Sequence, residues 1–128
     1  MITGIIICHG QLAAELKNAV ECILGPVESL LTFSNDKLSP RTLYDQIVQA
    51  MENQTDSPMI IMVDLRGGSC WSVAKLLTKE FQQMRILTGV NLPMLTAFLT
   101  KRRQNDLQTL AEIMENDAHR GILLENGL

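Results

Sequence analysis

Two short stretches of the chain carry side chains whose types and spacing are suited to chemistry. The first contains His9, which directly follows the apolar run Ile5–Cys8 and precedes Gly10. A histidine at the end of a strand is supported by the sheet on one side and open on the other. Its ring can then serve as a nucleophile, a proton carrier or a metal ligand. Gly10 lets the backbone turn tightly after the strand, so His9 is the first candidate for a reacting residue.

The second stretch runs from Asp64 to Ser69, reads Asp-Leu-Arg-Gly-Gly-Ser, and follows the apolar run Met59–Val63. An aspartate that accepts a hydrogen bond from one ring nitrogen fixes the tautomer of a histidine and leaves the lone pair of the other nitrogen facing outward. Gly67, Gly68 and Ser69 would present backbone N–H groups at a helix N-terminus, which favours a phosphoryl group. A nucleophile, an orienting carboxylate and an anion-binding loop are what phosphoryl transfer requires.

Each of these residues also has an ordinary structural interpretation. A histidine at a strand end is more often structural than catalytic, and an Asp-x-x-Gly-Gly-Ser loop is often only a turn with a helix cap. Arg66 fits a solvated loop position, and Cys8 and Cys70 fit small buried core residues. With His9 and Asp64, the two cysteines are also the members of a possible metal or thiol site. The helix N-terminus expected beside them favours an anion over a cation.

Alternating strand and helix patterns indicate how the two stretches are positioned. The order β-α-β-α-β-α-β predicts a three-layer α/β sandwich, with a mainly parallel sheet and helices on both faces. The first and third strands are the most continuously apolar, so we place them at the centre, where their carboxyl ends flank a crevice that collects ligands. The predicted strands are Ile2–Cys8, Val27–Ser34, Met59–Val63, Arg85–Thr88 and a short last strand, Gly121–Leu124; the predicted helices are Gln11–Leu24, one opened by Ser39 and Pro40, one after Ser69 and one from Asn91 to about His119.

The composition is typical of one soluble domain spanning residues 1–128, with 46% hydrophobic and 20% charged residues. A net charge of −3 argues against a nucleic-acid surface, and we interpret the one basic cluster, Lys101–Arg103, as a solvated helix end. Three cysteines without a C-x-x-C spacing suit a reducing cytoplasm. Apolar runs stay far below the ~20 residues of a membrane span, and the sequence contains no metal-binding motif.

Three motifs in the same order resemble one known family. They are Ile-Ile-Ile-Cys-His-Gly around His9, Val-Asp-Leu-Arg-Gly-Gly-Ser around Asp64, and Thr-Gly-Val-Asn-Leu-Pro-Met-Leu from Thr88. Together they resemble the EIIA domains of the mannose class of the bacterial sugar phosphotransferase system (PTS), over the chain from Ile2 to about Leu124. The resemblance implies a flavodoxin-like sheet of order 2-1-3-4. It also implies a homodimer in which the last strand, Gly121–Leu124, pairs with the sheet of the partner.

The resemblance further implies a function without any cofactor. In the family, the histidine of the first motif takes a phosphoryl group from phospho-HPr and passes it to a histidine of an EIIB partner. Carried over, His9 is the phosphorylated residue, Asp64 its hydrogen-bond partner, and Gly67–Ser69 part of the phosphate surroundings. The chain departs from the family pattern in having Cys8 where Thr is usual and Cys70 where Pro is usual. These departures bear on the rate and on the identity of the partner rather than on the reaction.

Three hypotheses follow from the sequence. The first is a cytoplasmic phosphohistidine carrier that serves sugar uptake between HPr and an EIIB component. The second is a PTS-linked regulatory protein, also phosphorylated on His9, whose charge state controls another protein. The third, from a different class, is a metal or thiol site formed by Cys8, His9, Asp64 and Cys70.

Overall fold

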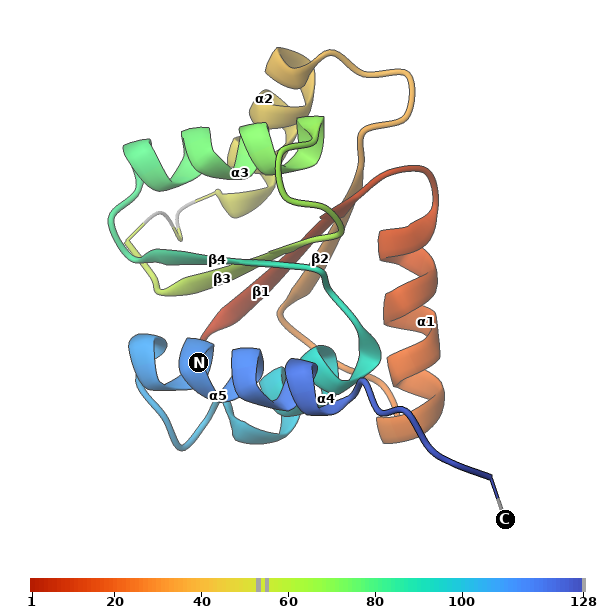
Figure 1. Ribbon diagram of the computed structural model, residues 1–128. Coiled ribbons are helices and arrows are strands. Elements are labelled where there is room, and N and C mark those ends of the chain that lie inside the picture. The colour runs from red at the N-terminus through yellow and green to blue at the C-terminus, as the bar shows by residue number, and fades with distance from the viewer. Residues whose placement is uncertain (53, 55, 128) are drawn as a thin grey trace.

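The computed structural model describes residues 1–52, 54 and 56–127 and contains a four-stranded parallel sheet covered by helices (Figure 1). The strand order is β2-β1-β3-β4, which confirms the expected order 2-1-3-4. In chain order the elements are β1 (Thr3–Cys8), α1 (Leu12–Leu24), β2 (Leu30–Ser34), α2 (Pro40–Met51), β3 (Met59–Val63), α3 (Ser69–Glu80), β4 (Met84–Thr88), α4 (Leu92–Lys101) and α5 (Leu107–Arg120).

The two central strands, β1 and β3, are buried along their whole length. Alternate residues point to opposite faces of a strand, so Ile6 and Met62 pack on the face covered by α1, α4 and α5, whereas Ile7 and Val63 pack on the face covered by α2 and α3. Figure 1 shows these two helical layers above and below the sheet. Burial of each such side chain stabilises the fold by about 1.5–3 kcal/mol. The three-layer sandwich is therefore confirmed, with a separate hydrophobic core on each face.

Local signals position the helix ends. The Ser39 hydroxyl accepts a hydrogen bond from the N–H of Thr42, and Pro40 occupies the first helical position, as predicted. The single helix predicted from Asn91 to about His119 is instead two helices, α4 and α5. The second begins anew where Asp106 caps the N–H of Thr109. None of the helices in the described part of the chain combines the length and the apolar character that a membrane span requires.

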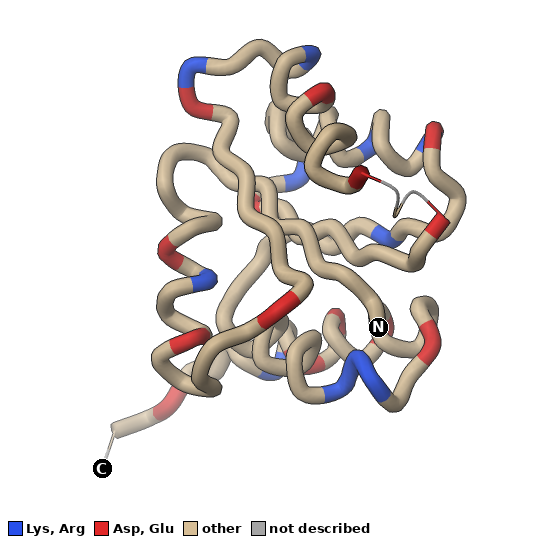
Figure 2. The backbone as a smooth tube through the Cα atoms, turned by 180° about the vertical axis from the view of Figure 1, so that it is seen from behind, with Lys and Arg blue, Asp and Glu red and all other residues tan. Residues whose placement is uncertain are grey.

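The basic cluster Lys101–Arg103 lies at the end of α4, as predicted, but the prediction that it is solvated is wrong for Arg102. Arg102 is only 5% exposed. Its guanidinium donates hydrogen bonds to the backbone carbonyls of Ile2, Glu28 and Ser29. Carbonyls near the amino end of the sheet need donors when they are covered, and a forked guanidinium can serve several at once. Elsewhere the basic residues lie among acidic ones over the helices and loops (Figure 2).

The prediction of a last strand at Gly121–Leu124 is wrong for a single chain. Gly121–Leu124 contains no strand in the structure. Instead, the segment leaves the end of α5 and runs away from the sheet (Figure 1), and Ile122, Leu123 and Leu124 are 77%, 77% and 94% exposed. A β-strand needs a neighbouring edge to accept its hydrogen bonds, and within one chain this segment is paired with no described strand.

The role found for Arg102 predicts a stability effect. Arg102→Ala removes the guanidinium donors of the carbonyls of Ile2, Glu28 and Ser29, of which the Ser29 carbonyl keeps the N–H of Gly4, so we expect the free energy of unfolding in urea to fall by about 2–4 kcal/mol. Arg103→Ala is the matched control, because Arg103 pairs with Glu28 on the surface, where both side chains are mostly exposed, and its loss should cost less than about 1 kcal/mol. Equal effects of the two substitutions would contradict the assigned role of Arg102.

Candidate functional site

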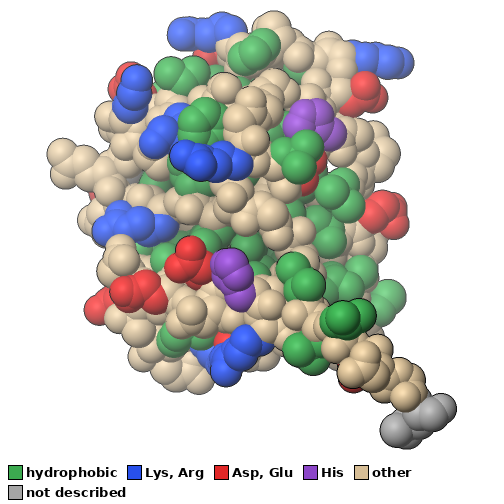
Figure 3. All heavy atoms as spheres, viewed as in Figure 1, with side chains coloured by type: hydrophobic (Ala, Val, Ile, Leu, Met, Phe, Trp, Pro, Cys, Tyr) green, Lys and Arg blue, Asp and Glu red, His purple; other side chains and the backbone are tan. Residues whose placement is uncertain are grey.

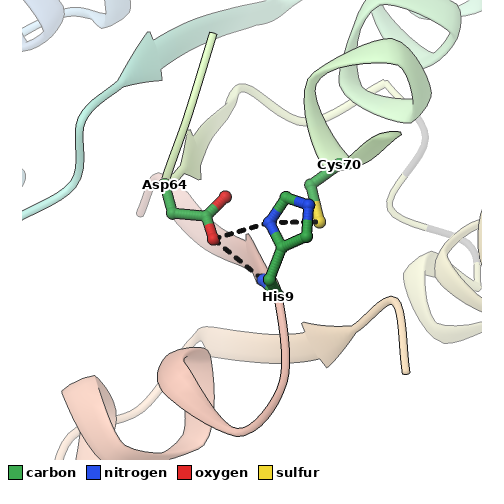
Figure 4. A group of neighbouring side chains, drawn as sticks. All are labelled: His9, Asp64 and Cys70. Carbon is green, nitrogen blue, oxygen red and sulfur yellow. Dashed lines mark hydrogen bonds and ion pairs between the residues drawn. The ribbon is translucent and has the colours of Figure 1, made fainter. Parts of the chain in front are cut away.

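The site lies where the two central strands end. β1 and β3 are parallel neighbours with Ile7 beside Val63, so the residues that follow them meet at the same edge of the sheet. There the Nδ1 atom of His9 lies 2.8 Å from Oδ2 of Asp64, and the backbone N–H of His9 donates to the same oxygen at 2.9 Å (Figure 4). The side chain of His9 is 43% exposed and that of Asp64 is 12% exposed. The structure thus brings together the predicted nucleophile and its predicted orienting partner.

Asp64 is held as a carboxylate. Burial by itself would raise the pKa of Asp64, but the hydrogen bonds from the backbone and ring of His9 and from the N–H of Leu65, together with the charge interaction with His9, outweigh it and lower the pKa below its ordinary value. An ionised carboxylate can only accept hydrogen bonds, so the proton between the two groups belongs to Nδ1. In the neutral ring the lone pair then lies on Nε2, the nitrogen that faces away from Asp64.

The glycine loop packs against the ring at the Nε2 side. Gly67 has a φ of +87°, a conformation that favours glycine, and Gly68 is the N-cap of α3. A Cβ atom added at Gly68 would lie 3.2 Å from Cε1 and 3.6 Å from Nε2 of His9. The backbone at the start of α3 therefore lies close to the free nitrogen, and the first N–H groups of a helix have no partner within the helix. This arrangement fits the predicted anion-binding loop.

Ser69 is held by a residue that the sequence analysis missed. The side-chain amide of Asn35 donates a hydrogen bond to the Ser69 hydroxyl oxygen at 3.0 Å. Asn35 directly follows β2, the other neighbour of β1, so three adjacent parallel strands deliver polar residues to one edge. This position directly after a strand is the sequence signal that could have identified Asn35 as a candidate site residue. With its oxygen accepting from Asn35, the Ser69 hydroxyl can direct its own proton elsewhere.

The two cysteines lie on different sides of the sheet. Cys8 belongs to the core under α1, α4 and α5, and Cys70 to the core under α2 and α3. Burial is the main cause that raises the pKa of Cys8 to about 12 and that of Cys70 to about 11, so both are neutral thiols near neutral pH. The Sγ atom of Cys70 lies 3.9 Å from Nδ1 of His9. The predicted four-residue metal or thiol cluster is thus reduced to His9, Asp64 and Cys70, whose ligand atoms lie within 4.8 Å of one another.

A hollow of about 520 Å³ lies beside this site along β4, between α3 and α5. Arg66, Trp71 and Lys75, from the loop before α3 and from α3 itself, line it together with His119 of α5. In Figure 3 hydrophobic side chains show between the upper and lower helices of this face. Arg66 is exposed and lines this hollow, as expected for a solvated loop residue.

The lowered pKa of Asp64 predicts how stability depends on pH. A carboxyl group whose pKa is lower in the folded than in the unfolded state contributes stability above its unfolded pKa of about 3.8, and this contribution is lost as the pH falls through the folded pKa. We therefore expect the wild-type protein to be more stable in urea than Asp64→Asn at pH 6, with a difference that shrinks as the pH falls from 5 to 3. A difference that stays constant over this range would contradict the account.

Comparison with known proteins identifies the family of the chain. A family model described as "EIIA-man: PTS system fructose IIA component" matches residues 3–115. The sorbose-specific EIIA component of Klebsiella pneumoniae is 30% identical over 95 residues, which cover 73% of this chain and 70% of that protein. The fructose-specific EIIA component of Bacillus subtilis (strain 168) is 30% identical over 114 residues, covering 86% and 77%.

Solved structures share the fold. An EIIA component from Streptococcus agalactiae superimposes with a TM-score of 0.89 at 23% identity, covering 96% of both chains. A mannose/sorbose-specific IIA subunit from Enterococcus faecalis has a TM-score of 0.83 at 17% identity, covering 99% of this chain and 96% of that one. Because the family model matches most of this chain, the chain belongs to the mannose-class EIIA family of the sugar phosphotransferase system.

Proposed function

We propose that the protein is a phosphohistidine carrier that accepts a phosphoryl group from phospho-HPr on Nε2 of His9 and passes it to an EIIB component. One observation carries this proposal: the hydrogen bond between Nδ1 of His9 and Oδ2 of Asp64 in a half-exposed ring. It leaves the nucleophilic lone pair on Nε2, next to the start of α3. Membership of the EIIA family supports a phosphotransferase role in general.

The proposed reaction is an in-line exchange between two imidazoles. The Nε2 lone pair of His9 forms a bond to phosphorus as the nitrogen–phosphorus bond of the donor breaks, and the donor imidazole keeps the bonding electrons. The proton on Nδ1 stays in place, so the phosphorylated ring becomes positively charged, and the Asp64 carboxylate stabilises that charge. Transfer to the acceptor reverses these events. The reaction as proposed requires neither a metal ion nor an organic cofactor.

The beginning of α3 supplies the surroundings of the phosphoryl group in this proposal. The backbone N–H groups that follow Gly67, together with the positive end of the helix dipole, favour an anion at this place. The Ser69 hydroxyl, whose oxygen accepts from Asn35, would turn its own proton toward a phosphoryl oxygen. Gly68 allows the close approach, since its missing side chain would contact the His9 ring.

We also infer the partners and the assembly from the family. The expected partners are HPr as the phosphoryl donor and a separate EIIB component as the acceptor, and working with them would place the chain in the cytoplasm. A regulated protein is the alternative to EIIB. A homodimer would pair the segment Gly121–Leu124 with the sheet of a second copy. The exposed apolar side chains of that segment (Ile122, Leu123 and Leu124) support this pairing, because a second chain would cover them and supply the missing strand partner.

Phosphorylation can be tested directly by intact mass. After incubation with enzyme I, HPr and phosphoenolpyruvate, we expect the wild-type chain to gain one phosphoryl group and His9→Ala to gain none. His119→Ala is the matched control, since the chain has only two histidines, and it should gain one group as the wild type does. An equal gain of mass by His9→Ala would contradict the proposal. Addition of an EIIB component then shows whether the group moves on, which separates transport from regulation.

The close packing of the loop predicts a second effect. Gly68→Ala places a Cβ atom 3.2 Å from the His9 ring, so the ring or the loop must shift by a few tenths of an ångström, and we expect phosphoryl acceptance to slow by roughly tenfold. Gly127→Ala is the control, because a Cβ atom there meets nothing within 4 Å. Rapid-quench measurement of the transfer from phospho-HPr checks this. An unaltered rate in Gly68→Ala would show that the loop does not position the ring.

A further inference from the structure

Asn35 approaches the end of β1 from the side opposite to Asp64. It is the first residue after β2, as Asp64 is the first residue after β3, and both strands are neighbours of β1. The backbone N–H of Asn35 donates to the carbonyl of Cys8 at 3.3 Å, and its carbonyl accepts from the N–H of Leu38 at 3.2 Å. Two backbone hydrogen bonds therefore hold Asn35 beside the residue that precedes His9.

The side chain of Asn35 is hydrogen-bonded to the start of α3. Its amide nitrogen Nδ2 donates to Oγ of Ser69 at 3.0 Å, and both residues are partly buried. Ser69 is the first residue of α3 and follows Gly68, whose backbone packs against the His9 ring near Nε2. The hydrogen bond thus joins two segments that are 34 residues apart in the chain, at the place proposed for the phosphoryl group.

The direction of this hydrogen bond decides what the Ser69 hydroxyl does with its proton. A hydroxyl donates one proton and accepts through its lone pairs, whereas an amide NH₂ group only donates. With Asn35 as the donor, the Ser69 proton must go to another acceptor. Burial raises the pKa of the Cys70 thiol and a hydrogen bond from the Ser69 side chain acts in the opposite direction, so the Cys70 sulfur is within reach. A thiol sulfur is a weak acceptor, and a charged phosphoryl oxygen is a much stronger one.

We propose that Asn35 is a positioning residue for phosphoryl transfer and acts through Ser69. By donating to the Ser69 oxygen, Asn35 leaves the hydroxyl proton to be donated to an oxygen of the phosphoryl group on Nε2 of His9. Asp64 fixes the proton of His9 in a corresponding way, so the residues that follow the two neighbouring strands orient the two protons of the site. This role rests on the proposed function, because it requires a phosphoryl group on His9.

The position of Asn35 predicts which kinetic constant changes. The Ser69 hydrogen bond is directed at oxygens whose charge is redistributed during the transfer. An interaction that is stronger in the transition state than in the bound ground state raises the maximal rate rather than the affinity. Loss of Asn35 should therefore lower the maximal rate of transfer from phospho-HPr and leave the half-saturating phospho-HPr concentration nearly unchanged.

The test is a double-mutant cycle on the full chain, with purified phospho-HPr as the only donor. In rapid-quench measurements, Asn35→Ala should lower the maximal rate roughly fivefold, because the Ser69 hydroxyl then rotates freely. In a Ser69→Ala background the same substitution should change the rate less than about twofold, since no hydroxyl is left to orient. Asn18→Ala is the matched control, because the Asn18 amide donates to Glu15 on the exposed surface of α1, and it should transfer as the wild type does. A loss of the same size in both backgrounds would reveal a merely structural role and overturn the proposal.

Asn35→Asp separates the direction of the hydrogen bond from the shape of the side chain. A carboxylate accepts from the Ser69 hydroxyl and takes its proton away from the phosphoryl group. We expect transfer in Asn35→Asp to be roughly twentyfold slower than in the wild type, and the loss to be smaller in the Ser69→Ala background, where only charge repulsion remains. Faster transfer by Asn35→Asp than by Asn35→Ala would overturn the proposal.

Two observations distinguish this role from folding and from the proposed function. Urea unfolding establishes that each variant is folded under the conditions of the transfer measurement. A wild-type chain that takes no phosphoryl group from phospho-HPr would contradict the proposed function and the role of Asn35 with it. Transfer to the wild type with an unchanged rate in Asn35→Ala would contradict the role of Asn35 alone.

Discussion

The chemistry of this protein depends on one carboxylate oxygen. Oδ2 of Asp64 accepts hydrogen bonds from both the backbone N–H and the ring Nδ1 of His9. The first bond holds the residue and the second holds its ring, so a single atom fixes the position, the orientation and the tautomer of the histidine. Without it, a half-exposed imidazole would rotate among several rotamers and distribute its proton between two nitrogens. Every proposed use of the site follows from this restriction.

The fold positions the two residues of this contact at neighbouring strand ends. Parallel pairing of β1 with β3 places Asp64 beside the end of β1, and the two cores hold these two strands because both are buried along their whole length. The tight turn after β3 then delivers the start of α3 to the opposite side of the ring. Catalytic groups on strand ends are positioned more accurately than groups on long loops. The hollow along β4 lies next to the site, but His9 is not among the residues that line it.

Much of this could be predicted from the sequence, because apolar strands followed at once by polar residues identify the carboxyl edge of a parallel sheet. His9, Asp64 and the Gly67–Ser69 loop are predicted in that way, and the structure places them at this edge. Asn35 also directly follows a strand, but its role could not be predicted, because its partner, Ser69, is 34 residues away along the chain. Arg102 was misjudged because a charged residue in a basic run looks solvated, and only the tertiary structure brings carbonyls to it. The strand expected at Gly121–Leu124 needs a neighbouring strand to hydrogen-bond with, and within one chain no described strand pairs with it.

The central claim is that Asp64 leaves Nε2 of His9 as the atom that takes the phosphoryl group. Nitrogen NMR of the phosphorylated protein, labelled with ¹⁵N in its histidine rings, tests this most directly, since the chemical shifts and the coupling to phosphorus identify the substituted nitrogen. The account predicts phosphorus on Nε2 and a proton on Nδ1 of His9. Phosphorus on Nδ1, or on no ring nitrogen of His9, would contradict it.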